Sequence, residues 1–131
     1  MTSYRDTCVF IEAIRGKPPE QKRARALFRD PNREVVSSQF VKLELLPNVR
    51  NPAEKLLLDG LFSAVQSWVP IDDNLVAHTA DIVRATGSAP IDGLHIACAE
   101  MGGVDELITC ESPTKPMFKW PPVRTIHISA I

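Results

Sequence analysis

The chain has 131 residues, the usual size of one domain, and 44% of them are hydrophobic, which is ample for a core. Its formal charge of −1 excludes a general polycation, so any binding of nucleic acid must depend on a local basic patch. There is no apolar leader segment, no run of membrane-spanning length and no CxxC pair among the three cysteines. We therefore expect a single domain over residues 1–131 of a reduced, cytoplasmic protein without membrane association.

Strand-like and helical segments alternate along the chain. The first half predicts a strand at Ser3–Arg5, helices at Val9–Ile14 and Glu20–Arg29, a strand at Glu34–Ser37, and a helix at Gln39–Leu46 capped by Ser38. The second half predicts a helix opened by Asn51-Pro52, a strand at Ser67–Val69, helices from Asp72 to Gly87 and at Gly93–Met101, and strands at Leu107–Thr109 and Val123–Ile128. This alternation indicates a parallel sheet with helices on both faces, whose site lies at the carboxyl ends of the strands.

Four carboxylates occupy positions that could meet at that edge of the sheet. Asp6 and Glu111 each follow a predicted strand, Asp92 stands near a helix start, and Glu44 lies inside an apolar helix. Two such charges about 4 Å apart repel by on the order of 4 kcal/mol at an effective dielectric of 20. A cluster of this kind makes sense if it holds a divalent metal, and a carboxylate-bound metal facing a phosphodiester is nuclease chemistry.

Each of these carboxylates also has an ordinary structural interpretation. Asp6 and Asp92 could cap the helices that follow them, and taken singly each fits a cap better than a metal ligand. Glu111 could be a solvated turn residue. Glu44 requires a partner or a metal only if its side chain is buried.

Four segments resemble, in chain order, the acidic motifs of PIN-domain ribonucleases, including the small bacterial group that contains the VapC-type toxins. These segments are Asp6–Ala13 (DTCVFIEA), Ser37–Leu46 (SSQFVKLELL), Ile91–Ala97 (IDGLHIA) and Gly103–Glu111 (GVDELITCE). The resemblance implies a PIN-like three-layer α/β/α sandwich around a parallel sheet of about five strands.

The same resemblance implies a metal-dependent endoribonuclease that cleaves single-stranded RNA and leaves 5′-phosphate and 3′-hydroxyl ends. Asp6, Asp92 and Glu111 would bind Mg²⁺ or Mn²⁺, and Glu44 would be a fourth catalytic residue, as a ligand or as support for the ligands. The metal would polarise the phosphate and lower the pKa of a bound water. A homodimer is a further implication, as is an antitoxin partner if the protein is the toxin of a toxin–antitoxin pair.

Three positions depart from the family pattern. Arg5 stands where an apolar strand residue is usual, Cys8 where Asn or Ser is common, and Glu111 where Asp is commoner. Because Cys8 removes a polar oxygen or amide beside Asp6, a non-catalytic module that binds nucleic acid or protein remains an alternative. A phosphatase or hydrolase that acts on a small molecule with the same cluster is a second alternative.

Seven of the fifteen basic residues lie between positions 15 and 33. From this segment we predict that Lys22, Arg25 and Arg29, which share a helix face, contact the RNA backbone together with Lys115 of the proline-braced loop after Glu111. Each of these four basic residues is interpreted equally well as an ordinary solvated surface residue. His95 and Cys98 lack the second pair of ligands that a zinc site needs, and we interpret His95 as a packed helix residue.

Overall fold

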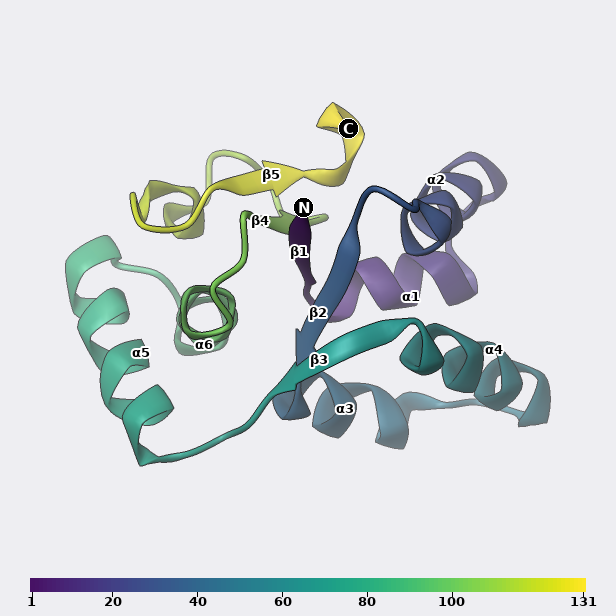
Figure 1. Ribbon diagram of the computed structural model, residues 1–131, viewed down its shortest axis with the longest axis horizontal. Helices are drawn as coiled ribbons and strands as arrows, with labels where there is room; N and C mark the ends of the chain where they lie inside the picture. Colours follow the sequence, from purple (N-terminus) through teal and green to yellow (C-terminus); the bar gives the residue numbers. More distant parts are fainter.

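Five parallel strands form the centre of the computed structural model, which describes residues 1–131 (Figure 1). The strands are β1 (Thr2–Arg5), β2 (Glu34–Ser38), β3 (Val65–Val69), β4 (Glu106–Thr109) and β5 (Thr125–His127). Their order across the sheet is β3-β2-β1-β4-β5, and every neighbouring pair is parallel. The order reverses at β1, which places the switch point of the sheet, where ligands bind in folds of this type, between the carboxyl ends of β1 and β4.

Helices cover both faces of the sheet and confirm the predicted three-layer α/β/α sandwich. They are α1 (Thr7–Arg15), α2 (Pro18–Arg29), α3 (Gln39–Leu45), α4 (Pro52–Ser63), α5 (Asp73–Thr86) and α6 (Pro90–Met101). In Figure 1, α1, α2 and α4 lie to one side of β1 and β2, whereas α5 and α6 lie to the other. Short 3₁₀ turns follow α3, β4 and β5, at Leu46–Asn48, Pro116–Lys119 and Ile128–Ala130. None of the helices combines the length and the apolar character that crossing a membrane requires.

Three of the helices have an N-cap side chain that hydrogen-bonds to a backbone N–H of the first turn. Ser38 caps α3 as predicted, because its hydroxyl accepts a hydrogen bond from the backbone N–H of Val41 at 3.3 Å. Asn51 and Asp72 cap α4 and α5 in the same way. These caps satisfy N–H groups that a helix leaves unpaired in its first turn, so they set where each helix begins.

The structure corrects the boundaries of several predicted elements. Helices α1 and α2 and strand β3 each begin two residues earlier than predicted, at Thr7, Pro18 and Val65. Helix α6 begins at Pro90 rather than Gly93, which places Asp92 inside the first turn instead of at the cap position. Strand β5 is only three residues long, against the predicted Val123–Ile128. The shorter strand results from a turn at one end, where Val123 N–H donates to the carbonyl of Trp120, and from a 3₁₀ turn that begins with Ile128 at the other.

Arg5, the unusual residue of β1, is fully buried between the sheet and α2. Its guanidinium donates to Ser3 Oγ and to the carbonyl of Leu27, both at 3.1 Å, and stacks over the ring of Phe28 at 5.1 Å. Burial lowers the pKa of Arg5 to about 10, while the nearby carboxylate of Glu106 acts in the opposite direction. Polar and aromatic contacts on the face away from α6 therefore accommodate most of this side chain, while its Nη1 is buried without a hydrogen-bond partner.

Helices α5 and α6 approach each other closely at Gly93. A Cβ atom on Gly93 would lie 2.6 Å from Cγ2 of Val83 on α5, which is closer than real Cβ contacts allow. The missing side chain lets the first turn of α6 pack against α5. This contact helps to fix the position of Asp92, the residue directly before Gly93.

Candidate active site

Asp6 lies at the end of β1, beside the switch point of the sheet. Its side chain is 3% exposed, and it makes no capping hydrogen bond to α1 even though Asp6 occupies the cap position. The Val9 N–H still acts on this carboxyl group, so a weak cap contact remains, but it does not account for the burial of the carboxylate. Burial raises the pKa of Asp6, with smaller opposing effects from His95, Cys8, Thr109 and the backbone N–H of Val9. A carboxylate that is costly to ionise in the folded protein is one that a bound cation would stabilise.

Cys8 supplies a hydrogen-bond donor next to Asp6. Its thiol lies 2.7 Å from Asp6 Oδ1 and also accepts a hydrogen bond from the backbone N–H of Cys110 at 3.0 Å. Hydrogen bonding with Cys110, burial and the charge of Asp6 all raise the pKa of the Cys8 thiol, so it stays protonated. All three cysteines are free thiols. A weak donor thus remains at the position where the family usually has Asn or Ser.

Asp92 and Glu111 face the same cation, the ammonium group of Lys115. Lys115 Nζ lies 2.6 Å from Glu111 Oε2 and 3.8 Å from Asp92 Oδ2. The hydrogen bond to Glu111 is the main reason that the pKa of Lys115 is raised. Asp92 is also in the first turn of α6, where the helix dipole favours a negative charge. The two carboxylates are therefore close enough to share one positive charge.

Glu44 reaches the same edge from α3. One of its oxygens, Oε1, accepts a hydrogen bond from the hydroxyl of Thr7 and lies 3.3 Å from Nε2 of His95. The Glu44 side chain is 27% exposed. Burial alone would raise the pKa of Glu44, but the hydrogen bonds from His95 and Thr7 outweigh it and hold the pKa below its usual range. Protein donors thus provide the partner that a half-buried carboxylate in this helix needs.

The four predicted site residues form two neighbouring groups rather than a closed ring. Asp6 and Glu44 are linked through their common neighbour His95, whereas Asp92 and Glu111 are linked through Lys115. No three His, Cys, Asp or Glu side chains are arranged as a ready-made metal site. The donors are nevertheless the hard oxygens that Mg²⁺ and Mn²⁺ prefer, and Lys115 already stands in as a cation between two of them. The residues present therefore fit a divalent metal of this kind.

His95 is the residue of this region whose contacts the sequence did not reveal. The expectation that it packs within a helix is correct, since it is 4% exposed, but both ring nitrogens have polar partners. Nδ1 lies 3.0 Å from the hydroxyl of Tyr4, and Nε2 faces Glu44. Its position three residues after Asp92, on the same face of α6, was the available signal.

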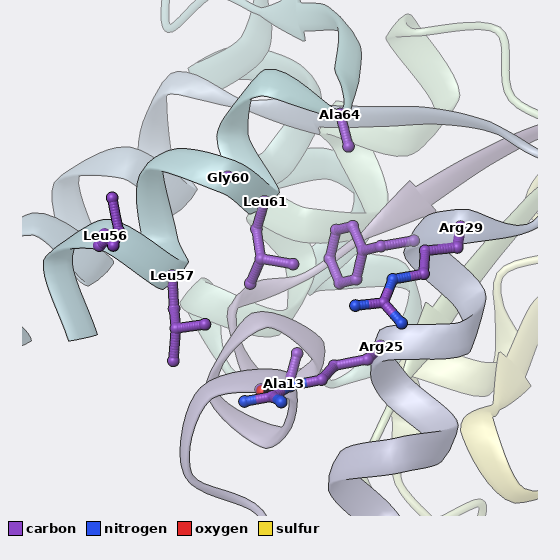
Figure 2. A pocket seen from close by; sticks show the side chains of 9 residues that line it. Ala13, Arg25, Arg29, Leu56, Leu57, Gly60, Leu61 and Ala64 are labelled. Carbon is purple, nitrogen blue, oxygen red and sulfur yellow. Dashed lines mark hydrogen bonds between the residues drawn. The ribbon is translucent and has the colours of Figure 1, made fainter. Parts of the chain in front are cut away.

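The predicted basic residues separate into two places. Lys115 lies with the carboxylates, but Arg25 and Arg29 line a cavity of about 290 Å³ between α2 and α4 (Figure 2). Arg25 also donates to the carbonyl of Ala13 at 2.8 Å. Most of the cavity lining is apolar and includes leucines of α4, at positions 56, 57 and 61. No ion pair or hydrogen bond connects Lys22, Arg25 or Arg29 to the four site carboxylates.

Comparison with known proteins agrees with this arrangement. The family model described as "PIN domain" matches residues 4–112, which include all four carboxylates. The chain belongs to the PIN-domain family. No curated protein matches this PIN domain by sequence.

Solved structures share its fold at low sequence identity. VapBC2 from Rickettsia felis, bound to a DNA fragment from its promoter, has a TM-score of 0.71 and 15% identity, with 97% of this chain and 98% of that chain covered. A toxin–antitoxin complex from Klebsiella pneumoniae has a TM-score of 0.70 and 17% identity, with 92% and 94% covered. FitAB bound to the IR36 DNA fragment has a TM-score of 0.64 and 18% identity, with 96% and 94% covered. At these identities the likeness establishes the PIN-like fold that the motifs predicted.

Proposed function

We propose that this PIN domain is a metal-dependent endoribonuclease that cleaves single-stranded RNA and acts as the toxin of a toxin–antitoxin pair. The observation that carries the proposal is that four acidic residues form two pairs, Asp6 with Glu44 beside His95, and Asp92 with Glu111 on either side of the Lys115 ammonium. Membership of the PIN family and the likeness to structures of toxin–antitoxin complexes support it.

In this proposal Asp6, Asp92 and Glu111 hold Mg²⁺ or Mn²⁺. When bound, such an ion supplies Lewis-acid polarisation of the phosphodiester and acidifies the attacking water. Asp6 favours a bound cation because its own burial makes an uncompensated charge costly. Glu44, held by Thr7 and His95, orients the attacking water by accepting a hydrogen bond. Lys115 leaves the carboxylates and contacts the phosphate of the RNA.

The contact of Cys8 with Asp6 favours catalysis over the non-catalytic alternative. An apolar residue at position 8 would leave Asp6 Oδ1 without a donor, whereas the protonated thiol provides one. The small-molecule hydrolase alternative predicts cleavage of a small chromogenic phosphodiester at a rate comparable to that of RNA. We expect RNA to be strongly preferred.

The test is cleavage of end-labelled single-stranded RNA by purified protein with Mg²⁺ or Mn²⁺, and with a chelator. We expect metal-dependent cleavage that leaves 5′-phosphate ends, and a loss on the order of 100-fold or more in Asp6→Asn and Asp92→Asn. Asp72→Asn is the matched control, because Asp72 caps α5 and Asn is an equally good cap. Cleavage that persists in chelator, or wild type that binds metal without cleaving RNA, would contradict the proposal.

The path of the RNA is tested by its dependence on salt. Neutralising Lys22, Arg25 and Arg29 together should weaken RNA binding and flatten the slope of log affinity against log salt, by roughly 0.7 for each lost phosphate contact. Metal binding should persist, since these residues make no contact with the carboxylates. An unchanged slope in the triple variant would place the RNA elsewhere and leave Lys115 as the phosphate contact.

We also propose a homodimer, which the family resemblance implies, and a protein partner of the antitoxin kind, as in the toxin–antitoxin complex that this fold resembles. The cavity between α2 and α4 offers a surface for that partner, because its lining combines exposed leucines with Arg25 and Arg29 (Figure 2). Light scattering at micromolar concentration tests the dimer, and a monomer would remove that part of the proposal.

A further inference from the structure

A line of hydrogen-bonding groups runs from the interior of the sheet to Glu44. The hydroxyl of Ser38, which accepts from Val41 N–H, lies 2.9 Å from the hydroxyl of Tyr4. The Tyr4 hydroxyl lies 3.0 Å from Nδ1 of His95, and Nε2 of His95 lies 3.3 Å from Glu44 Oε1. Tyr4, Ser38 and His95 are all buried, so solvent has little access to these bonds.

The carboxylate at the end of this line fixes the direction of every hydrogen bond. An ionised carboxylate only accepts, so the proton of a singly protonated His95 ring must lie on Nε2, the nitrogen that faces Glu44. Nδ1 then has a free lone pair and accepts from the Tyr4 hydroxyl, which in turn accepts from Ser38. Burial raises the pKa of Tyr4 well above its usual value, so the hydroxyl keeps the proton that it donates. The order is therefore consistent from Val41 to Glu44, and the Cys98 thiol is an additional partner of Tyr4 and Ser38.

We propose that His95 is a positioning residue for Glu44. Its Nε2–H, oriented by Tyr4 and Ser38, holds Glu44 Oε1 in place together with the hydroxyl of Thr7. The second oxygen, Oε2, has no hydrogen-bond or ion-pair partner and is left to act on the water or the metal of the site. This role rests on the proposed nuclease function.

Glu44 needs such support because of where it lies. Its side chain is long and partly exposed, so without a fixed donor it would lose the orientation that its role requires and move into solvent. Both donors contact the same oxygen of Glu44, Thr7 from α1 and His95 from α6. Two donors from two helices define the plane of the carboxylate, which one donor does not.

The position of the ring proton gives a first test that does not depend on activity. Protein labelled with ¹⁵N-histidine is examined by NMR at about pH 8, above the ordinary histidine pKa of about 6.5. We expect the Nε2–H tautomer for His95, assigned by the signals that disappear in His95→Gln. Tyr4→Phe removes the donor to Nδ1 and should increase the other tautomer. A predominant Nδ1–H tautomer in the wild type would overturn the proposal.

The second test compares two substitutions of the same histidine. His95→Met removes the donor at similar volume, whereas His95→Gln keeps an N–H group near the place of Nε2. We expect His95→Met to lower kcat on RNA by about 10–100-fold with little change in KM, and to weaken Mn²⁺ binding measured without RNA. His95→Gln should recover most of both losses, and His95→Met should have no further effect in a Glu44→Gln background.

The matched control is His78→Met, because His78 also contacts a glutamate of α6, Glu100, but lies outside the site. It should change neither kcat nor Mn²⁺ binding. The positioning role is overturned if His95→Gln loses as much activity as His95→Met. It is also overturned if His95→Met lowers kcat as much in the Glu44→Gln background as in the wild type. In both cases the nuclease function stands. Wild-type protein that neither binds Mn²⁺ nor cleaves RNA would instead overturn the nuclease function itself.

Discussion

Asp6→Asn should stabilise the metal-free protein and abolish its response to metal. Asp6 is almost completely buried, and burial raises the pKa of its carboxyl group in the folded state. A raised folded-state pKa means that the contribution to stability is fully present below the unfolded pKa of about 3.9 and is lost as the pH rises through the folded value. At neutral pH the ionised Asp6 therefore lowers the free energy of unfolding, and removing its charge should raise it.

The size of the effect follows from what Asn retains. Asn keeps the oxygen that accepts from the Cys8 thiol at 2.7 Å and loses only the charge. We expect a gain of about 0.5–2 kcal/mol in the free energy of unfolding, as for other stabilising substitutions. For a chain of 131 residues this corresponds to roughly 4 °C in Tm for each kcal/mol. Metal at a hundred times its Kd should stabilise the wild type by about 2.7 kcal/mol, or roughly 10 °C, and the variant hardly at all.

The assay is thermal denaturation of wild type and Asp6→Asn at pH 5 and pH 8, with chelator or with Mn²⁺. The variant's advantage in chelator should be larger at pH 8 than at pH 5, because burial raises the pKa of Asp6 and the cost of its ionisation therefore grows with pH. Asp72→Asn should show neither effect, since Asp72 caps α5 and makes no hydrogen bond or ion pair with a site residue. A variant less stable than wild type at pH 8 in chelator, or one that gains equally from Mn²⁺, would refute the reasoning.

Two glycines make a matched pair in a denaturation experiment. Gly93→Ala should lower the free energy of unfolding by about 1–3 kcal/mol, because the new Cβ would lie 2.6 Å from Val83. Gly60→Ala should raise the free energy of unfolding by about 0.5–1 kcal/mol, because Gly60 lies inside α4 with open space around it. The opposite order would contradict the close packing of α5 and α6. Lys115→Met should tighten Mn²⁺ binding a few-fold in calorimetry, because Lys115 competes with the metal for Glu111. The same substitution should weaken RNA binding. Unchanged affinities for both Mn²⁺ and RNA would show that Lys115 is not part of the site.

Much of the fold could be predicted because local signals agree with the final structure. The alternation of strands and helices, the cap at Ser38 and the turns are encoded in short segments. The placement of Asp6 and Glu111 directly after strands brought them to one edge once the sheet was known to be parallel. The exact switch point could not be predicted from the residues alone, because strand order depends on which strands pair over long distances.

The contacts that define the site depend on packing between distant elements. The contact of His95 with Glu44 joins α6 to α3, and the spacing of His95 from Asp92 on α6 indicates only that His95 lies near the site, not that it contacts Glu44. Lys115 was predicted at the site because it follows Glu111, but its bridge to Asp92 required the loop to fold back over α6. Arg25 was expected to share an RNA-binding face, yet it donates to the carbonyl of Ala13 on α1 and lines the cavity beside α4, because α1 packs against both α2 and α4.

The most direct test of the central claim is an anomalous difference map from crystals of the protein grown or soaked with Mn²⁺. We predict one strong manganese peak at the switch point, within roughly 2.0–2.6 Å of carboxylate oxygens of Asp6, Asp92 and Glu111. Lys115 should then have moved away from Glu111, which it contacts at 2.6 Å in the structure described above. A peak elsewhere, or no peak at millimolar Mn²⁺ with Lys115 still bound between Asp92 and Glu111, would contradict the metal site on which the proposed nuclease activity depends.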